Sequence, residues 1–317
     1  VGFLAASDDH KTRPGLASPG VSGNLTQFGG LAGVWAEEKT GDAIFDALRA
    51  RHAYAASSAD RIIVDLEMGG QGMGERLPMT DERRLRARIM GTAPVTEASV
   101  VKNGEIVYTK RPSTGDMGSK VTVEVAFESS SEPTGRDNPR PHRPWQGTLE
   151  VRGAQLVGAR AMNFTNPYQE KVEIDARDPS KVNFFTETRG RADKMLLELE
   201  DATPSTQIVI RLDRPREVGG SPVQVRQRAT LPARTLRFPF SRLSDGRAVE
   251  EMPFGEGPDL DTVSIELIAE DAPLDYDFEF VDTSDLAWGD YYYVRVTQLN
   301  GARAWSSPIW VGGEAPR

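Results

Sequence analysis

An aspartate and a histidine two residues apart, near the start of the chain, are the residues best suited to chemistry. The motif Ser7-Asp8-Asp9-His10 follows a short apolar run, residues 1–6, which the sequence predicts to be a strand. At the end of a rigid strand, the Asp8 carboxylate and the His10 imidazole can both reach one metal ion. Oxygen and nitrogen donors suit zinc, manganese or iron, so the motif predicts a divalent transition-metal site.

The motif also has a simpler interpretation, a solvated turn in which Asp8 caps the local backbone. A catalytic metal needs three or more protein ligands, and this motif supplies two. Asp9 can be a ligand, a partner that orients His10, or an exposed residue. Arg13 lies close enough in sequence to contact a small anionic substrate, although an arginine exposed in a loop is the more common case.

The amino-acid composition of the chain limits the classes of partner that it can bind. The chain has 317 residues, enough for two or three domains, and 38 Lys+Arg against 47 Asp+Glu give a net charge of -9. Nonspecific nucleic-acid binding depends on basic surface, so we expect no nucleic-acid partner. No apolar run approaches the roughly 20 residues of a membrane helix, so we expect no membrane span. The absence of Cys excludes disulfides.

The chain has only three histidines, His10, His52 and His142. Such a low count predicts that the remaining metal ligands come from an N-terminal segment, covalent or a separate chain. We expect His52, directly after a helix, to be structural and His142 to be exposed in a linker. No signal peptide is visible, so the compartment stays open, with a periplasmic or extracellular location compatible with the sequence.

Residues 1–82 have an α/β pattern. After the strand at 1–6 and a loop rich in Gly, Pro and Ser, an apolar run at 31–36 predicts a second strand. Thr40 is a predicted N-cap for a helix that ends near Arg51, and residues 61–68 predict a third strand. The glycines at 69–74 are not followed by a helix, so they predict a turn and not a phosphate loop. This order of elements is typical of the end of an α/β barrel.

From residue 83 the apolar period changes to two, typical of strands. Asn103-Gly104 and Asn300-Gly301 each predict a hairpin. We expect 83–128 and 262–317 to form one discontinuous immunoglobulin-like or fibronectin-like β-sandwich. Residues 129–261 are then a β-rich insertion, with linkers at 129–144 and 244–261 around five strand-like runs. The predicted fold class is α+β and mostly β.

Five aromatic residues cluster near the C-terminal end, at Tyr291, Tyr292, Tyr293, Trp305 and Trp310. They could form a platform for carbohydrate. Aromatic residues that alternate on a hairpin are more often part of a sandwich core or edge, which is the interpretation that we prefer.

Three segments, residues 2–10, 29–38 and 43–55, together with Gly91–Pro94, Lys102–Glu105 and Ala304–Val311, carry a family resemblance. They resemble the C-terminal half of the proteins grouped as domain of unknown function 3604. The resemblance is specific over 1–110 and 288–312 and weak in between, which supports an inserted middle region.

That family is similar to the PHP (polymerase and histidinol phosphatase) metal-dependent phosphoesterases. Their fold is a distorted β/α barrel, and their last motif is Ser-Asp-x-His. The resemblance implies that Asp8 and His10 each bind a metal, whereas the earlier motifs of that family have no counterpart here. It therefore predicts the C-terminal portion of a hydrolase that uses metal-activated water on phosphate esters, with residues 1–82 closing the barrel. The alternatives are a non-enzymatic β-sandwich module for binding or interaction, and a metallohydrolase of other substrates.

Overall fold

The computed structural model describes residues 2–6, 29–57, 60–112, 120–129, 143–164, 170–188, 192–214, 233–243, 246–253, 260–269 and 272–312. Most of these residues lie in β-strands, as predicted, and the described part contains one α-helix. The chain forms two compact units. The first unit is Val1–Pro112 with Ala272–Arg317, and the second unit is Ser113–Asp271.

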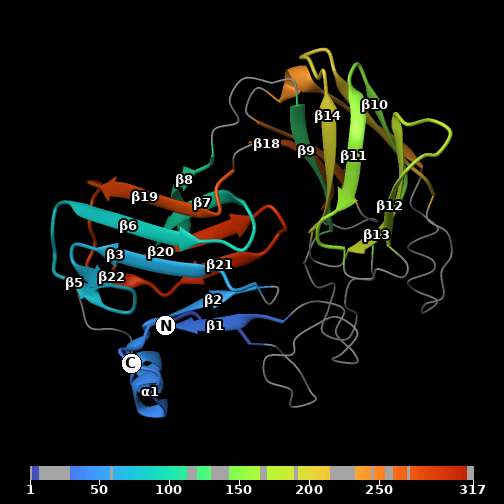
Figure 1. The fold of residues 1–317 in the computed structure, drawn as a ribbon. Coiled ribbons are helices and arrows are strands. Elements are labelled where there is room, and N and C mark those ends of the chain that lie inside the picture. The colour runs from blue at the N-terminus through green and yellow to red at the C-terminus, as the bar shows by residue number, and fades with distance from the viewer. Residues whose placement is uncertain are drawn as a thin grey trace. The chain divides into compact units, whose positions relative to one another are not determined.

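The first unit contains two sheets (Figure 1). The larger sheet has the order β1 (Leu31–Val34), β2 (Ala53–Ala56), β21 (Arg303–Ser306), β20 (Tyr291–Gln298), β22 (Ile309–Val311) and β5 (Arg76–Leu77), with β7 (Val95–Lys102) paired to β20 and β8 (Glu105–Lys110) paired to β7. The smaller sheet has the order β19 (Asp275–Asp282), β6 (Arg83–Met90), β3 (Ile63–Met68) and β4 (Gln71–Gly72).

Alternation along the strands explains why these two sheets share one core. In β6, Leu85 and Ile89 are fully buried while the arginines between them are exposed. In β20, Tyr292 and Val294 are fully buried, and both belong to the same apolar cluster as the inward residues of β6. Two sheets that each have one apolar face can bury it only against each other.

Both predicted hairpins are present. Lys102 pairs with Glu105 across a two-residue turn, in which Asn103 and Gly104 have φ angles of 53° and 91°. Positive φ at both positions is what a type I′ turn requires. At the second hairpin, β20 and β21 are joined by a longer turn, and Gly301 alone has a positive φ there, 80°. The Gly69-Gly70 pair forms the turn between β3 and β4, as expected.

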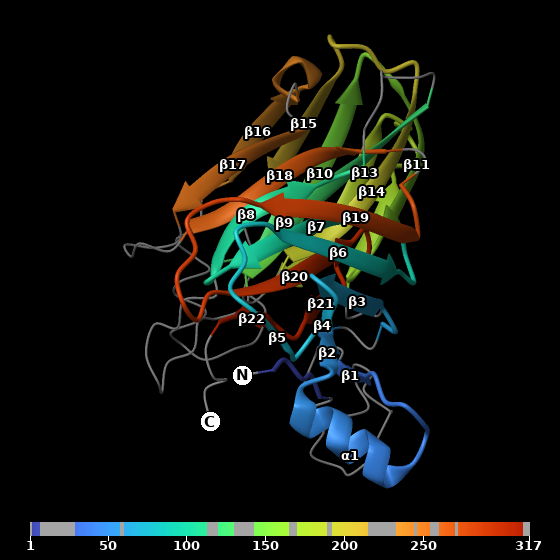
Figure 2. The same ribbon diagram turned by 90° about the vertical axis from the view of Figure 1, so that its left-hand side faces the viewer.

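The helix α1 (Gly41–Ala50) lies where the sequence predicts it. The Thr40 hydroxyl accepts a hydrogen bond from the Ala43 backbone N–H at 3.3 Å, and Arg51 ends the helix with a φ of 64°. In both views α1 projects away from the sheets of its unit (Figures 1 and 2). The described part of the chain contains no helix that is long and apolar enough to cross a membrane.

The order strand, helix, strand at 31–56 does not lead to a barrel among the described residues. Strands that a helix connects in a β/α barrel run parallel, but β1 pairs with β2 antiparallel. On its other side β2 pairs antiparallel with β21, so these strands extend the larger sheet of the first unit. The strand predicted at 1–6 is also wrong for residues 2–6, which join no sheet.

The second unit contains two five-stranded antiparallel sheets. One has the order β11 (Gln155–Ala161), β14 (Ala192–Glu200), β9 (Lys120–Glu128), β18 (Leu260–Ile268) and β17 (Arg247–Pro253). The other has the order β12 (Lys171–Ile174), β13 (Lys181–Thr188), β10 (Arg143–Arg152), β15 (Gln207–Leu212) and β16 (Arg234–Pro239), followed by the short 3-10 helix η1 (Phe240–Arg242). The five strand-like runs of the middle region are therefore strands.

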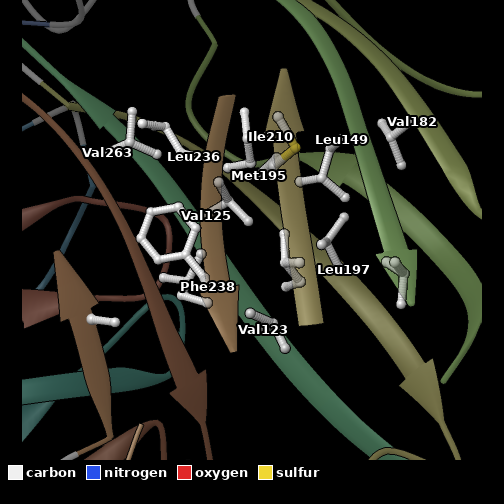
Figure 3. Close-up of a cluster of buried hydrophobic side chains, with 14 of the residues drawn as sticks. Val123, Val125, Leu149, Val182, Met195, Leu197, Ile210, Leu236, Phe238 and Val263 are labelled. Atoms are coloured by element: carbon white, nitrogen blue, oxygen red, sulfur yellow. The ribbon is translucent and has the colours of Figure 1, made fainter. Parts of the chain in front are cut away.

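One apolar core joins these two sheets (Figure 3). Figure 3 shows Val123 and Val125 of β9 and Leu197 of β14 among the side chains of the cluster, with Leu149 of β10 and Ile210 of β15. All five are fully buried. The inward faces of both sheets thus provide the apolar burial that stabilises this unit.

Strand pairing gives the middle region other boundaries than those predicted from the sequence. β9 pairs with β14 and β18, so all three lie in the second unit, whereas the predicted division is 1–82, 83–128 with 262–317, and 129–261. That three-part division remains a prediction. The predicted linker at 244–261 contains a strand, β17. In Arg247–Pro253 the buried residues Ala248 and Met252 lie on one side of the strand, which is the alternation of a half-buried strand.

Candidate functional site

The residues predicted to carry chemistry, Asp8, Asp9, His10 and Arg13, lie outside the described residues, so the structure does not test their arrangement. The structure does describe the residues on both sides of them, at 2–6 and from Gly29 onward. These flanks determine where the motif connects to the fold.

Both flanks are held against the first unit. The Phe3 backbone N–H donates to the Ser307 hydroxyl at 3.1 Å, and the Phe3 ring meets the Tyr293 ring edge-on, with centroids 5.1 Å apart. The Gly30 backbone N–H donates to the Ala6 carbonyl at 2.8 Å. Ala6, which directly precedes the motif, is therefore tied to the residue that leads into β1.

Glycine is required at this point of contact. A Cβ at Gly30 would lie 2.5 Å from the Ala5 Cβ and 3.0 Å from the Ala56 carbonyl oxygen. Any larger residue would force the flanks of the motif apart from each other and from β2.

Apolar side chains next to these flanks are left in solvent. Leu4 is 60% exposed, Trp35 43%, Ile44 37% and Phe45 58%. Only Ala47 of α1 is buried. An isolated helix of ten residues is marginal in water, and most helices are stabilised by packing an apolar face. The uncovered side of α1, with Ile44 and Phe45, is called here the α1 surface and is therefore suited to a partner.

Among the other histidines, the structure describes only His52. His52 Nε2 lies 3.6 Å from a Glu75 carboxylate oxygen, with both side chains more than a third exposed. His142 lies outside the described residues. Within the described ranges no three His, Cys, Asp or Glu side chains come together in a metal-binding group.

A buried ionic cluster that the sequence did not reveal lies at the end of β19. The Asp282 carboxylate accepts hydrogen bonds from Tyr292 Oη at 2.5 Å and Lys102 Nζ at 3.1 Å, and it lies 3.1 Å from Arg83 Nη2. Lys102 Nζ is also 3.4 Å from an Asp290 oxygen. Two cations and two carboxylates thus balance in a site where each side chain is at most 12% exposed.

Electrostatics in this cluster favour the charged forms. Burial alone would raise the pKa of Asp282, but hydrogen bonds from Ser284, Tyr292 and Lys102 hold that pKa well below its usual range. Burial and the neighbouring Asp282 raise the pKa of Tyr292. These contacts pair the charged groups with one another and join β6, β7, β19 and β20. Arg83 has the same parity in β6 as the buried Leu85 and Ile89, so the alternation of the strand separates it from the exposed arginines, whereas its partner Asp282 is not visible in the local sequence.

The outer face of the smaller sheet of the first unit carries a shallow groove with interleaved charges. Carboxylates and guanidinium groups are cross-strand neighbours in it: Arg88 between Asp65 and Asp277, and Arg86 between Glu67 and Glu279. Arg86 Nε lies 2.8 Å from a Glu279 carboxylate oxygen. Opposite charges at cross-strand positions stabilise a solvated sheet face, which is sufficient to explain this groove.

The predicted aromatic platform is not one surface. Tyr292 is fully buried and Trp310 is 6% exposed, with the Arg51 guanidinium over its ring. Tyr291 and Tyr293 stack on the opposite side of β20, with centroids 6.5 Å apart. The interpretation as sandwich core and edge therefore fits these residues better than a carbohydrate platform.

Comparison with known proteins adds one match. Residues 4–94 match the model of a family described as "Protein of unknown function (DUF3604)". The match covers less than a third of the chain and includes the Asp8–His10 motif, Arg13, α1 and the strands from β1 to β6. No curated protein matches the chain.

Proposed function

We propose that this chain is the C-terminal portion of a PHP-like metal-dependent hydrolase that acts on phosphate esters. Asp8 and His10 bind a divalent transition metal, zinc, manganese or iron, and Arg13 contacts the anionic substrate. The remaining metal ligands come from a segment outside this chain, covalently attached or separate. The observation that carries the proposal is the motif itself, a carboxylate and an imidazole two residues apart in the sequence that directly follows the anchored Ala6.

Three features support this proposal together. The family match includes the motif, although its description names no activity. The donor types, carboxylate and imidazole, suit the metals named. Leu4 on one side of the motif and Trp35 and Phe45 on the other leave apolar surface that a ligand-bearing segment would cover.

The chain's own groups have separate roles in this mechanism. A metal held by Asp8, His10 and further ligands would acidify a bound water and polarise the phosphoryl oxygen. The Asp8 carboxylate brings negative charge to the site, and His10 binds through a neutral ring nitrogen, so protons compete with the metal for the imidazole. The Arg13 guanidinium orients the anion by charge-assisted hydrogen bonds.

The finer parts of the fold belong to the same proposal. We take residues 1–82 to close a PHP-like β/α barrel whose other strands lie outside this chain. Because β1 is paired antiparallel with β2 here, completing a barrel requires β1 to gain a parallel partner. We take residues 83–128 and 262–317 to form an immunoglobulin-like β-sandwich, with residues 129–261 as an insertion.

Metal analysis tests the proposal. We expect the full-length protein, purified without chelator, to contain transition metal, and Asp8→Ala or His10→Ala to weaken metal affinity by at least about 100-fold, because each removes a direct ligand. Elemental analysis of the purified proteins and titration with zinc and manganese measure this. The matched controls are Asp46→Ala and His52→Ala, which remove the same donor types elsewhere and should retain the metal.

Three results are decisive. If the full-length protein holds no transition metal, or if Asp8→Ala and His10→Ala retain it, the hydrolase proposal fails. The alternative of a β-sandwich binding or interaction module is then favoured. If metal is bound but a panel of phosphomonoesters and diesters is not hydrolysed while amides or carboxylate esters are, the enzyme is a metallohydrolase of other substrates.

A further inference from the structure

Trp288, which the sequence did not single out, is the most exposed large hydrophobic residue described. Its side chain is 71% exposed, whereas the aromatic residues of the neighbouring β20 are half-buried or buried. Tryptophan is usually well buried, because its indole removes a large apolar area from water. A tryptophan held in solvent in this way suggests that the indole contacts a ligand.

The backbone that carries Trp288 is tightly held. The Asp290 backbone N–H donates to the Ala287 carbonyl at 3.2 Å, and the Ala287 N–H donates to an Asp290 carboxylate oxygen at 3.1 Å. Gly289 between them has a φ of 92°, which suits the third position of a type II turn. Its N–H donates to the Val311 carbonyl at 2.9 Å. Trp288 therefore occupies the second position of a closed turn.

The buried ionic cluster also holds the residues that precede the turn, Ser284 and Asp285, by hydrogen bonds. Lys102 Nζ donates to the Ser284 hydroxyl at 2.9 Å and to the Asp285 carbonyl at 3.1 Å. Arg83 donates to the Ser284 carbonyl at 2.6 Å and, with its other terminal nitrogen, to the Asp81 carbonyl at 2.9 Å. One guanidinium thus ties residues 80–81 to residues 283–290, so the entropy cost of ordering them is met before any ligand binds.

Met79 completes a small apolar surface beside the indole. A Cβ at Gly312 would lie 2.7 Å from Met79 Sδ and 2.9 Å from Trp288 Cδ1, so both side chains pack against the bare backbone of that glycine. Met79 is itself 51% exposed. We call Trp288, Met79 and Gly312 the Trp288 patch.

The surroundings of the patch limit the class of ligand. Thr283, Ser284 and Asp285 precede Trp288 in the same segment and Asp81 follows Met79 by two residues; all four are exposed, and their hydroxyl and carboxylate oxygens are called here the acceptor rim. The cations that contact this segment, Arg83 and Lys102, are buried against Asp282, so none is offered to an anionic ligand. A flat apolar ring with hydrogen-bond acceptors at its rim suits a molecule with an apolar C–H face and many hydroxyl donors.

We propose that the Trp288 patch binds neutral carbohydrate, with one pyranose ring stacked on the indole and its hydroxyl groups directed to the acceptor rim. The apolar area, one indole and one thioether side chain, is far below the roughly 800 Å² that a stable protein partner buries on each side. A single sugar ring matches that area. This site is independent of the metal centre proposed above.

Affinity electrophoresis with the full chain tests the proposal. In native gels cast with soluble neutral polysaccharides, namely β-glucan, xylan and galactomannan, we expect at least one to retard the protein. The corresponding oligosaccharide should bind with a dissociation constant of about 1 mM, and Trp288→Ala should weaken it by at least about tenfold. Trp288→Tyr keeps an aromatic face and should retain most of the binding. Ile106→Ala, which removes another exposed apolar side chain of the same unit, 51% exposed, is the matched control and should bind like the wild type.

Clear outcomes would overturn this assignment. Because Trp288 is exposed, Trp288→Ala should unfold at the wild-type temperature, which separates lost binding from lost folding. The proposal is wrong if no neutral polysaccharide retards the wild type, or if Trp288→Ala and Ile106→Ala weaken retardation equally. It is also wrong if tetramethylammonium quenches Trp288 fluorescence at concentrations where no sugar does, because the patch would then be a cation site.

Discussion

Replacing Asp282 with alanine is expected to destabilise the first unit by about 3–5 kcal/mol. Removal of this carboxylate leaves the Arg83 guanidinium and the Lys102 ammonium buried with only Asp290 to balance them. It also removes the acceptor of the Tyr292 hydroxyl. Urea unfolding followed by hydrogen exchange in β6, β19 and β20 measures the loss. The matched control is Asp285→Ala, an exposed carboxylate three residues away, which should change stability by less than about 0.5 kcal/mol.

The stability difference between the wild type and Asp282→Ala is expected to depend on pH. The pKa of Asp282 is lower in the folded than in the unfolded state, so its contribution is complete above the unfolded value of about 4. This contribution to stability is lost as the pH falls through the pKa of Asp282 in the folded state, where the native carboxylate also takes up a proton. We therefore expect the stability difference between wild type and Asp282→Ala to be constant from pH 8 to about 5 and to shrink below that. A difference that grows on acidification would contradict the assigned ion pairs.

Replacing Phe127 with alanine is expected to destabilise the second unit by about 3–5 kcal/mol. The Phe127 ring, on β9, is fully buried and lies 5.4 Å from the Trp145 ring and 4.9 Å from the Phe184 ring, which belong to the opposite sheet. Truncation leaves a cavity between the two sheets that neither backbone can close. Equilibrium unfolding monitored by hydrogen exchange in β9, β10 and β13 measures the change.

A volume-matched variant separates the cavity from the loss of the aromatic ring. Phe127→Leu fills most of the space and should cost about 1.5 kcal/mol or less. If Phe127→Ala and Phe127→Leu destabilise the unit equally, the ring contacts and not the cavity dominate. If neither variant changes the free energy of unfolding by more than about 0.5 kcal/mol, the assignment of Phe127 to the core between the sheets is wrong.

Much of the local structure followed from the sequence. Thr40 predicted the start of α1 and the neighbourhood of Arg51 its end, because helix caps are properties of contiguous residues. Asn103-Gly104 predicted its hairpin for the same reason, since the two residues adopt the positive φ angles themselves. The Asp8–His10 motif was likewise read from adjacent residues, and its role as a metal site remains a prediction.

Tertiary structure alone decided which strands pair and what is buried. β9 and β18 are separated by more than 130 residues yet are neighbours in one sheet, and no local pattern reports a partner so distant. The alternation of β6 turns Arg83 inward, but its carboxylate partner Asp282 comes from β19, far away in the sequence. Trp288 is exposed because Asp290, Lys102 and Arg83 hold its turn at the surface. The sequence by itself thus determined the elements and nominated the metal ligands, while long-range contacts determined the sheets, the ionic cluster and the exposed indole.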